Sequence, residues 1–219
     1  MKKIIPILTL IFAVVLIGGC NKGINLEDYV TDLREEIYTA EGENFSLKIY
    51  YGYKETPFNN DGAVGTRINY LTVRLLGVPD TATEYTFTAD IDGTTLNGEF
   101  SFNPVANALS AKAELNKKPP ASFEITISSA ASSQTLTAVS ALPEGTISYK
   151  QALLSLEKNQ AELINNYVSD GKFTAEIYLR VMIRNDKPYY YVGFAKNGKI
   201  TALLVDGFNG DILAVKTVL

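Results

Sequence analysis

From Phe45 to Leu142 the sequence is a succession of short β-forming segments, and this pattern limits the fold more than any other feature. Clusters of Gly, Pro, Asn, Asp and Ser separate the segments, as turns require. The segments span residues 45–53, 67–77, 84–91, 98–104, 108–115, 122–129 and 134–141. Seven short strands at this regular spacing predict an all-β sandwich with Greek-key connections over residues 45–142.

The predicted sandwich is immunoglobulin-like in its architecture only. The chain has one Cys and no Trp, so the disulfide and the buried Trp of an antibody domain are both missing. A likeness of architecture implies no particular function.

A change of pattern at Pro143 marks a predicted domain boundary. Ser148, followed three residues later by Gln151, has the form of a capping box at a helix N-terminus. Apolar residues then recur at helical spacing, and Asp170-Gly171 supplies a stop signal. We therefore expect one long helix over about residues 149–168.

Four segments with strand character follow the predicted helix. They span residues 173–184, 189–196, 200–207 and 212–218, and Asn197-Gly198 between the second and third is a strong hairpin signal. Apolar and polar residues alternate in residues 173–184, as expected for a sheet that is covered on one side. The expected fold is therefore two-domain: an all-β sandwich, then an α+β domain (143–219) in which the long helix packs on an antiparallel β-meander.

The C-terminal segment contains three short motifs that point to a family. They are Tyr190-Tyr191-Val192, Val205-Asp206-Gly207 and Gly210-Asp211-Ile212-Leu213. With the preceding helix they resemble the PepSY and PepSY-like domains over about residues 145–218. Those domains are small α+β modules of exported bacterial proteins, including peptidase propeptides. The resemblance implies a non-enzymatic module that binds or restrains a peptidase in the cell envelope.

The N-terminus has the features of a secretory signal. Lys2 and Lys3 precede 14 apolar residues, 4–17, a run that is too short to cross a bilayer. The residues Ile17-Gly18-Gly19-Cys20 resemble a bacterial lipobox. We expect residues 1–19 to be a lipoprotein signal peptide and Cys20 to carry the lipid (diacylglycerol, with palmitate-type chains). This would hold the exported protein at the outer face of a bacterial cell membrane. An ordinary signal peptide with a spare thiol and an uncleaved anchor are the alternatives.

Residues 20–44 are expected to connect the lipid to the body. Asn25 is a plausible N-cap, and the apolar residues after it recur at spacings of three and four. These apolar residues are Leu26, Tyr29, Val30, Leu33 and Ile37. They predict a spacer helix of about three turns, docked on the sandwich, and then a linker over 39–44. A helix that binds a partner is the alternative.

Charge and composition exclude several classes of function. From Cys20 onward 18 basic and 24 acidic side chains remain, because Lys2 and Lys3 are lost, and the net charge becomes −6. Such a surface does not favour nucleic acid. The chain has no His, which removes His-dependent triads and most zinc sites. We therefore expect no enzyme, no cofactor and no nucleic-acid partner.

Clustered carboxylates are the remaining candidates for chemistry. Asp90 and Asp92 are two residues apart, a spacing that could serve a calcium loop or a carboxylate pair for glycoside hydrolysis. The Asp92-Gly93 pair fits a hairpin turn better, and we expect no metal there. Asp206 and Asp211 also flank a turn.

Two tyrosine runs suggest a binding surface. Residues 50–53 contain three Tyr, and Tyr189, Tyr190 and Tyr191 are consecutive. Neighbours in a strand point to opposite faces, so about half of these rings should pack in the core. The rest could bind a partner. The candidate binding surface consists of Tyr189, Tyr190, Tyr191, Asp206 and Asp211.

The leading functional hypothesis is a membrane-anchored, non-catalytic envelope lipoprotein that acts as a binding module for a peptidase or another envelope protein. A structural or adhesive surface protein that uses the sandwich is the second hypothesis. A ligand-binding lipoprotein that serves a transporter is the third, although the chain lacks the two α/β lobes of common solute-binding proteins.

Overall fold

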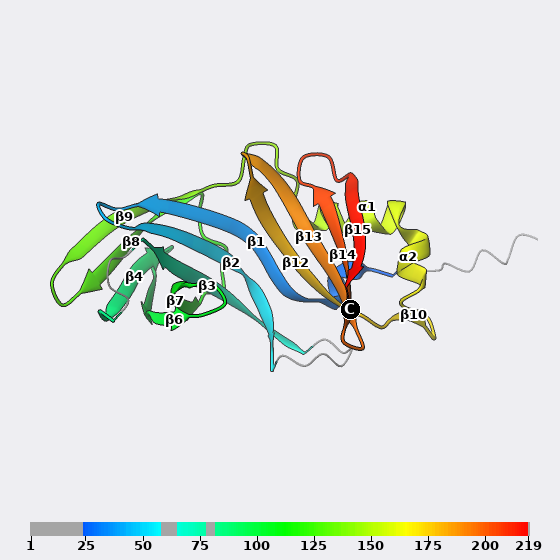
Figure 1. The fold of residues 1–219 in the computed structure, drawn as a ribbon, viewed down its shortest axis with the longest axis horizontal. Helices are drawn as coiled ribbons and strands as arrows, with labels where there is room; N and C mark the ends of the chain where they lie inside the picture. Colours follow the sequence, from blue (N-terminus) through cyan, green and yellow to red (C-terminus); the bar gives the residue numbers. More distant parts are fainter. Residues whose placement is uncertain (1–23, 58–64, 78–81, 219) are drawn as a thin grey trace, which may run out of the picture.

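The computed structural model describes residues 24–57, 65–77 and 82–218. It is an elongated molecule dominated by one large, strongly curved sheet (Figure 1). Two long strands, β1 (Val30–Glu41) and β2 (Ser46–Thr56), run through the middle of the sheet and connect its two ends. Within the described residues, no helix is both long enough and apolar enough to cross a membrane.

The expected spacer helix is wrong, because most of that segment is strand β1. Only a short 3₁₀ turn, η1 (Leu26–Tyr29), forms after Asn25, whose side chain accepts a hydrogen bond from the backbone of Glu27. Strand β1 has irregularities between Val30 and Asp32 and between Arg34 and Glu36. An extra residue in a strand shifts the alternation of its faces. The buried residues Val30, Leu33 and Ile37 therefore stand three and four positions apart, which imitates a helix.

One half of the molecule is a curled, nearly closed sheet around a first core. On one side of β1 lie β2, β3 (Thr66–Leu76), β7 (Ala108–Glu114) and β6 (Ser101–Asn103). On the other side β9 (Ser133–Ser140) pairs with β1, followed by β8 (Ser122–Ser129), β4 (Tyr85–Ile91) and β5 (Thr94–Glu99). The first core lies inside this curl and includes Tyr38, Ile49, Leu71, Phe87 and Ile125.

The other half contains the four C-terminal strands. They are β12 (Glu176–Arg184), β13 (Lys187–Lys196), β14 (Lys199–Asp206) and β15 (Ile212–Val218). Each pairs antiparallel with the next, as the hairpin signals indicate. Strand β12 also pairs with β1, in parallel, with Leu33 opposite Leu179 and Arg34 opposite Arg180. A separate two-stranded ribbon, β10 (Val168–Ser169) and β11 (Lys172–Phe173), precedes β12.

The expected fold class, a sandwich followed by an α+β domain with a long helix on a meander, is wrong. The fold is mainly β, and 13 strands belong to one sheet. Strand β1 is the branch point: its first residues pair with β12, and Tyr38 and Thr39 near its end pair with β9. The sheet therefore continues across the boundary predicted at Pro143.

The expected long helix is two short ones. Helix α1 (Tyr149–Asn159) begins with the predicted capping box of Ser148 and Gln151. It ends before Gln160, and α2 (Ala161–Asn165) follows in a new direction. Gln160 places an amide where the apolar stripe requires a hydrophobic side chain, so continuing the helix would bury a polar group.

A second core lies between α1 and the C-terminal strands. Leu153 and Leu156 of α1 pack there with Ile177, Leu179 and other residues of β12–β14. This core also includes four residues of the segment that was expected to be a spacer: Leu26, Val30, Leu33 and Ile37. The N-terminal part of the chain is therefore built into the C-terminal half.

Candidate functional site

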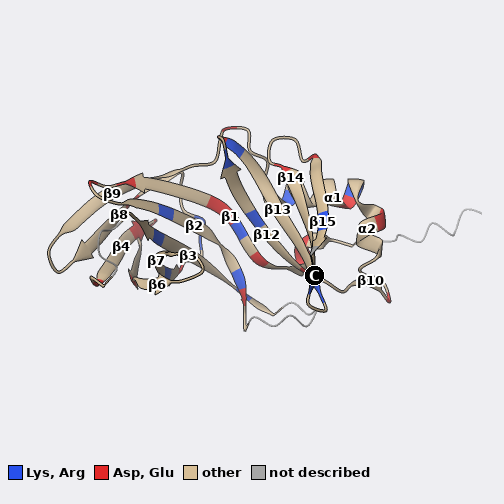
Figure 2. Ribbon diagram, in the orientation of Figure 1, with Lys and Arg blue, Asp and Glu red and all other residues tan. Residues whose placement is uncertain are grey.

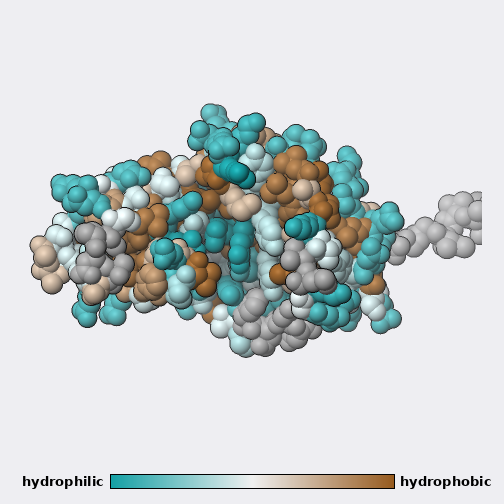
Figure 3. Space-filling model, viewed as in Figure 1, coloured by the Kyte–Doolittle hydropathy of each residue, from teal (hydrophilic) through white to brown (hydrophobic). Residues whose placement is uncertain are grey.

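A polar groove crosses the sheet between its two halves, and its lining includes Tyr50, a buried member of the second core. The volume of the groove is about 440 Å³, and it lies over β12, β1, β2, β3 and β7. Figure 3 shows a hydrophilic hollow in the middle of the face in view, and Figure 2 shows basic positions on β1, β2 and β12 in the same region. We call it the basic groove; its charged and aromatic lining includes Asp32, Arg34, Tyr50, Lys54, Tyr70, Arg74, Lys112 and Arg180.

Strand alternation builds the groove from residues far apart in the sequence. Leu179, Leu33 and Leu71 point into the cores, so their neighbours Arg180, Arg34 and Tyr70 face the groove. The register then aligns the five strands: Arg34 lies between Arg180 on β12 and Gly52 on β2. Gly52 in turn lies opposite Tyr70, and Thr72 lies opposite both Tyr50 and Lys112.

Gly52 in the floor of the groove permits a close approach of two backbones. A Cβ atom at this position would overlap the carbonyl oxygen of Leu33 on β1. The overlap occurs just before the irregularity between Arg34 and Glu36. Glycine is therefore needed where the distorted strand β1 comes close to β2.

Two arginines lie against the ring of Tyr50, and a third, Arg180, lies opposite Arg34 in the register of the sheet. The guanidinium carbon of Arg34 is 3.9 Å from the ring centroid, and that of Arg74 is 4.9 Å from it. Burial lowers the pKa of the Arg34 guanidinium below its usual value, and the positive charges of Arg180 and Arg74 lower it further. Like charges in such proximity repel one another, so the cluster favours an added negative charge.

Only part of the hydrogen-bonding capacity of these arginines is used within the described residues. Arg180 donates through Nη2 to Oδ2 of Asp32 at 2.8 Å. Arg74 donates through Nη1 to the Tyr50 hydroxyl at 3.4 Å, whereas its buried Nε has no described partner. Guanidinium groups bind carboxylate and phosphate through paired N–H donors, so Arg34 and Arg74 retain donors for a ligand.

Two lysines form a second cationic centre beside the first. The Nζ atom of Lys112 is 3.6 Å from the centroid of the Tyr70 ring. Burial lowers the pKa of the Lys112 amine, and the charge of Lys54 adds to this effect, while Asp32 and Glu114 oppose it. Both lysines therefore contribute positive charge to the lining of the same groove.

The charge of the basic groove contrasts with that of the whole chain. Its described lining has five cations and a single carboxylate, Asp32, although the chain carries a net charge of −4. Tyr50 and Tyr70 hold three of the cations in place through cation–π contacts. The arrangement is suited to binding an anionic group.

The residues of the predicted binding surface do not form one site. Tyr190 is buried, with an exposed fraction of 2%, and its hydroxyl donates to the backbone oxygen of Ile147 at 2.6 Å. Tyr189 and Tyr191 are half-buried on the opposite face of β13. Tyr191 pairs with Arg180, which places it beside the basic groove.

The two carboxylates of the predicted surface organise a turn. Asp206 accepts through Oδ1 from the backbone N–H groups of Phe208 and Asn209, at 2.8 and 3.3 Å. Asp211 accepts through Oδ2 from the Asn209 side chain at 2.8 Å. Both groups therefore have a structural role between β14 and β15.

The carboxylate pair Asp90 and Asp92 also belongs to a turn. Asp90 accepts from the backbone N–H of Gly93 at 3.0 Å, and Asp92 has a φ of 51° in the β4–β5 hairpin. In the part of the chain that the structure describes, no group of acidic or other ligating residues could hold a metal ion. Cys20, the predicted lipidation site, lies outside the described residues.

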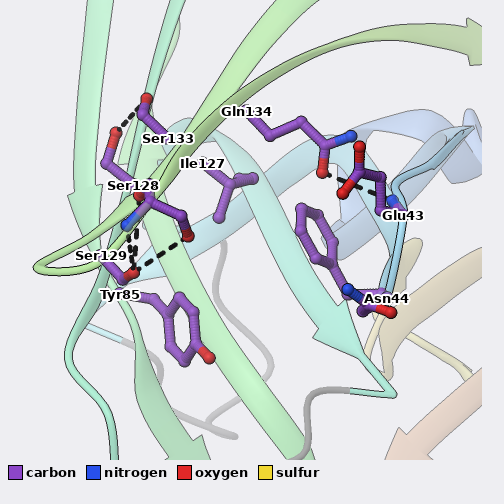
Figure 4. Close-up of a pocket in the computed structure, with 10 residues that line it drawn as sticks. Glu43, Asn44, Tyr85, Ile127, Ser128, Ser129, Ser133 and Gln134 are labelled. Atoms are coloured by element: carbon purple, nitrogen blue, oxygen red, sulfur yellow. Dashed lines mark hydrogen bonds between the residues drawn. The ribbon is translucent and has the colours of Figure 1, made fainter.

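A second pocket, of about 320 Å³, lies in the curled half of the sheet (Figure 4). Phe45, Tyr85 and Ile127 supply its apolar lining, and four serines, at positions 128, 129, 132 and 133, line its polar side. The serines already bond to one another, for example Ser128 to Ser133 at 3.0 Å. Because these hydroxyls already hydrogen-bond to one another, they have fewer free hydrogen-bonding positions for a ligand than the cations of the basic groove.

Sequence reasoning missed the basic groove as a site. The alternation of Tyr70, Thr72 and Arg74 on one face of a strand is visible in the sequence. Which strands lie beside it is not, and the arginines come from three strands. Comparisons with protein-family models, curated proteins and solved structures gave no match. The resemblance to PepSY domains therefore stays a prediction.

Proposed function

We propose that this protein is a non-catalytic cell-envelope lipoprotein that acts as a binding module. In this proposal a lipid on Cys20 holds the exported chain at the outer face of a bacterial membrane. The charged start, the short apolar run and the lipobox-like residues 17–20 support the anchor. The partner is an envelope protein with an acidic surface, and the resemblance of residues 145–218 to PepSY domains favours a peptidase.

The observation that carries the binding role is the basic groove. Five cations line it against one carboxylate, on a chain that is acidic overall. Tyr50 and Tyr70 hold Arg34, Arg74 and Lys112 in place before any ligand arrives. Binding to such a pre-organised site costs less side-chain entropy than binding to free lysines and arginines.

The binding role is tested with an anionic polymer. The mature chain with Cys20→Ser, which cannot be lipidated, is titrated with poly-L-glutamate in a calorimeter at about 50 and 300 mM NaCl, because salt screens exposed charges. We expect binding that weakens with salt and that falls at least about tenfold in the double variant Arg34→Gln/Arg74→Gln.

The matched control removes two charges elsewhere. Lys187 and Lys199 are exposed at the first positions of β13 and β14. The double variant Lys187→Gln/Lys199→Gln has the same net charge as the groove variant and should bind the polymer like the parent. Equal losses in the two variants would refute the groove as the binding site.

The anchor is tested separately in cells. An alkyne-labelled palmitate should be incorporated into the wild-type chain and should be absent from the variant Cys20→Ala. Label on the variant, or a wild-type chain released from membranes by salt alone, would contradict a lipid anchor on Cys20.

A further inference from the structure

The basic groove has two cationic centres with a fixed separation. The first comprises Arg34 and Arg74 against the ring of Tyr50, and the second is Lys112 against the ring of Tyr70, with Lys54 also in the lining of the groove. Tyr50 lies opposite Thr72, whereas Tyr70 lies opposite Gly52. Tyr50 and Tyr70 are therefore diagonal neighbours on two antiparallel strands, a relation that separates residues by about 7–8 Å.

The aromatic rings of the groove are occupied by cations. Arg34 and Arg74 lie against Tyr50, and Lys112 lies against Tyr70. These contacts cover ring faces on which a sugar would stack, which disfavours a carbohydrate. The backbone groups of β1, β2, β3 and β7 are also paired with one another in the sheet, so they are not free to bind a ligand. Recognition therefore depends on charged side chains.

The diagonal spacing of Tyr50 and Tyr70, against which the two centres lie, is close to that of alternate side chains on an extended peptide. Alternate residues of a β-strand lie on one face and are about 6.4–6.8 Å apart, twice the rise per residue. A carboxylate fits the planar donors of arginine, and a second carboxylate fits the lysine ammonium groups. Two acidic side chains at positions i and i+2 would therefore meet both centres together.

We propose that the basic groove binds an extended acidic peptide segment with two carboxylate side chains two residues apart. One carboxylate binds Arg34 and Arg74, while Arg180 remains paired with Asp32. The other binds Lys112, and Lys54 adds positive charge to the same groove. Glu114 opposite Tyr70 limits the acidic stretch at that side of the groove, because a further carboxylate there would be repelled. The proposal rests on the proposed binding role and specifies its ligand.

The test compares labelled peptides of equal charge and different spacing. Each has two Glu in a Gly/Ser frame: adjacent, at positions i and i+2 (Glu-Ala-Glu), or separated by three residues, with a Gln-Ala-Gln peptide as the uncharged control. Fluorescence anisotropy is measured on the mature Cys20→Ser chain at about 150 mM NaCl, where long-range attraction is screened. We expect the Glu-Ala-Glu peptide to bind at least about fivefold more tightly than the other two, because only it reaches both centres without strain.

Two groove variants test which cationic centre binds each carboxylate of the peptide. Arg74→Gln and Lys112→Gln should each weaken the binding of the Glu-Ala-Glu peptide about tenfold. Each should also abolish the advantage of this peptide over the one with adjacent Glu residues. Lys199→Gln should change neither the affinity nor the preference. Thermal unfolding confirms that each variant is folded. If a variant fails to fold, the spacing series on the parent chain decides alone.

The outcomes separate this inference from the proposed function. Binding that is equal for all three Glu spacings, with poly-L-glutamate still bound, would overturn the peptide spacing and leave the binding role. Displacement of the peptide by inorganic pyrophosphate at lower concentration than by unlabelled peptide would indicate a small oxyanion ligand and would also overturn it. If neither polymer nor peptide binds, both proposals are wrong.

Discussion

Arg34 holds a positive charge in a half-buried position, where burial, Arg180 and Arg74 lower its pKa and Tyr50 and Asp32 partly offset this effect. An apolar side chain of similar size at this position would remove both the desolvation cost and the repulsion between like charges. We expect Arg34→Met to raise the free energy of unfolding by about 1 kcal/mol, because relief of repulsion and desolvation exceeds the lost contact with Tyr50. Urea denaturation measures this change.

The control for Arg34 keeps the charge. Arg34→Lys retains a cation in the same place and should not increase stability, although it loses the planar donors. A decrease of about 1 kcal/mol or more in Arg34→Met would mean that the arginine is a structural group, not a residue kept for binding.

Single-residue predictions that depend on local geometry were confirmed in part, since the neighbours Tyr50 and Tyr51 are both buried against the expected alternation. The alternation of faces predicts that the tyrosine run 189–191 is divided, and Tyr190 is indeed the buried ring. The turn at Asp92-Gly93 depends on two positive φ angles, which Asp and Gly adopt readily. The basic groove depends on which strands are neighbours, and no local pattern carries that information.

At the scale of one element, the N-terminus of α1 is the best-specified feature of the chain. The Ser148 hydroxyl accepts from the Gln151 backbone N–H at 3.3 Å, and the Gln151 side chain accepts from the Ser148 backbone at 2.8 Å. Ser148→Ala should lower the free energy of unfolding by about 1 kcal/mol, because it leaves helix N–H groups without a partner. Thermal or urea unfolding would show the loss.

The matched variant at the same position restores the cap. Ser148→Asp again presents an oxygen to the Gln151 N–H and should remain close to the parent in stability. If Ser148→Asp loses as much as Ser148→Ala, the hydroxyl contributes through packing and the capping role is wrong.

Elements with irregular geometry were the ones that sequence patterns described wrongly. Strand β1 contains two irregularities, so its buried residues have helical spacing, and a period-based reading assigns a helix. Helix α1 ends at Asn159, because the apolar stripe of the predicted long helix is interrupted at Gln160. Both errors arise because tertiary packing, not local period, determines the element.

At the scale of the molecule, buried tyrosines couple stability to alkaline pH. Burial raises the pKa of Tyr51 and Tyr53 to about 12, and it raises the pKa of Tyr38, Tyr149, Tyr178 and Tyr190 as well. The folded state therefore holds these phenol protons more tightly than the unfolded chain. The stability from this source is complete below pH about 10 and is lost as the pH rises toward 12.

An absorbance titration of tyrosinate checks this coupling. A fraction of the 13 tyrosines should resist ionisation above pH about 10 and ionise only as circular dichroism reports loss of the fold. In urea all of them should titrate in one step near the ordinary tyrosine pKa. A single step in the native protein, with the fold intact, would contradict the burial of these rings.

The whole sheet also depends on a long-range pairing that the sequence does not reveal. The parallel contact of β1 with β12 joins Leu33 to Leu179, with most of the chain between them. Parallel pairing needs a long connection and gives no turn signal, unlike the hairpins among β12–β15. Patterns within each half therefore predicted most of its strands, with β1 the main exception, and missed their union in one sheet.

This union predicts that the C-terminal half cannot fold alone. A fragment of residues 143–219 lacks Leu26, Val30, Leu33 and Ile37, which are buried in its core, and it exposes the edge of β12 that pairs with β1. By itself the fragment should lack a cooperative unfolding transition and should tend to aggregate through the free edge. Mixing it with a fragment of residues 24–142 should restore near-UV circular dichroism and a cooperative transition. Cooperative unfolding of the fragment 143–219 without its complement would instead show that β12–β15 and α1 form an independent domain, and that β1 only docks against it.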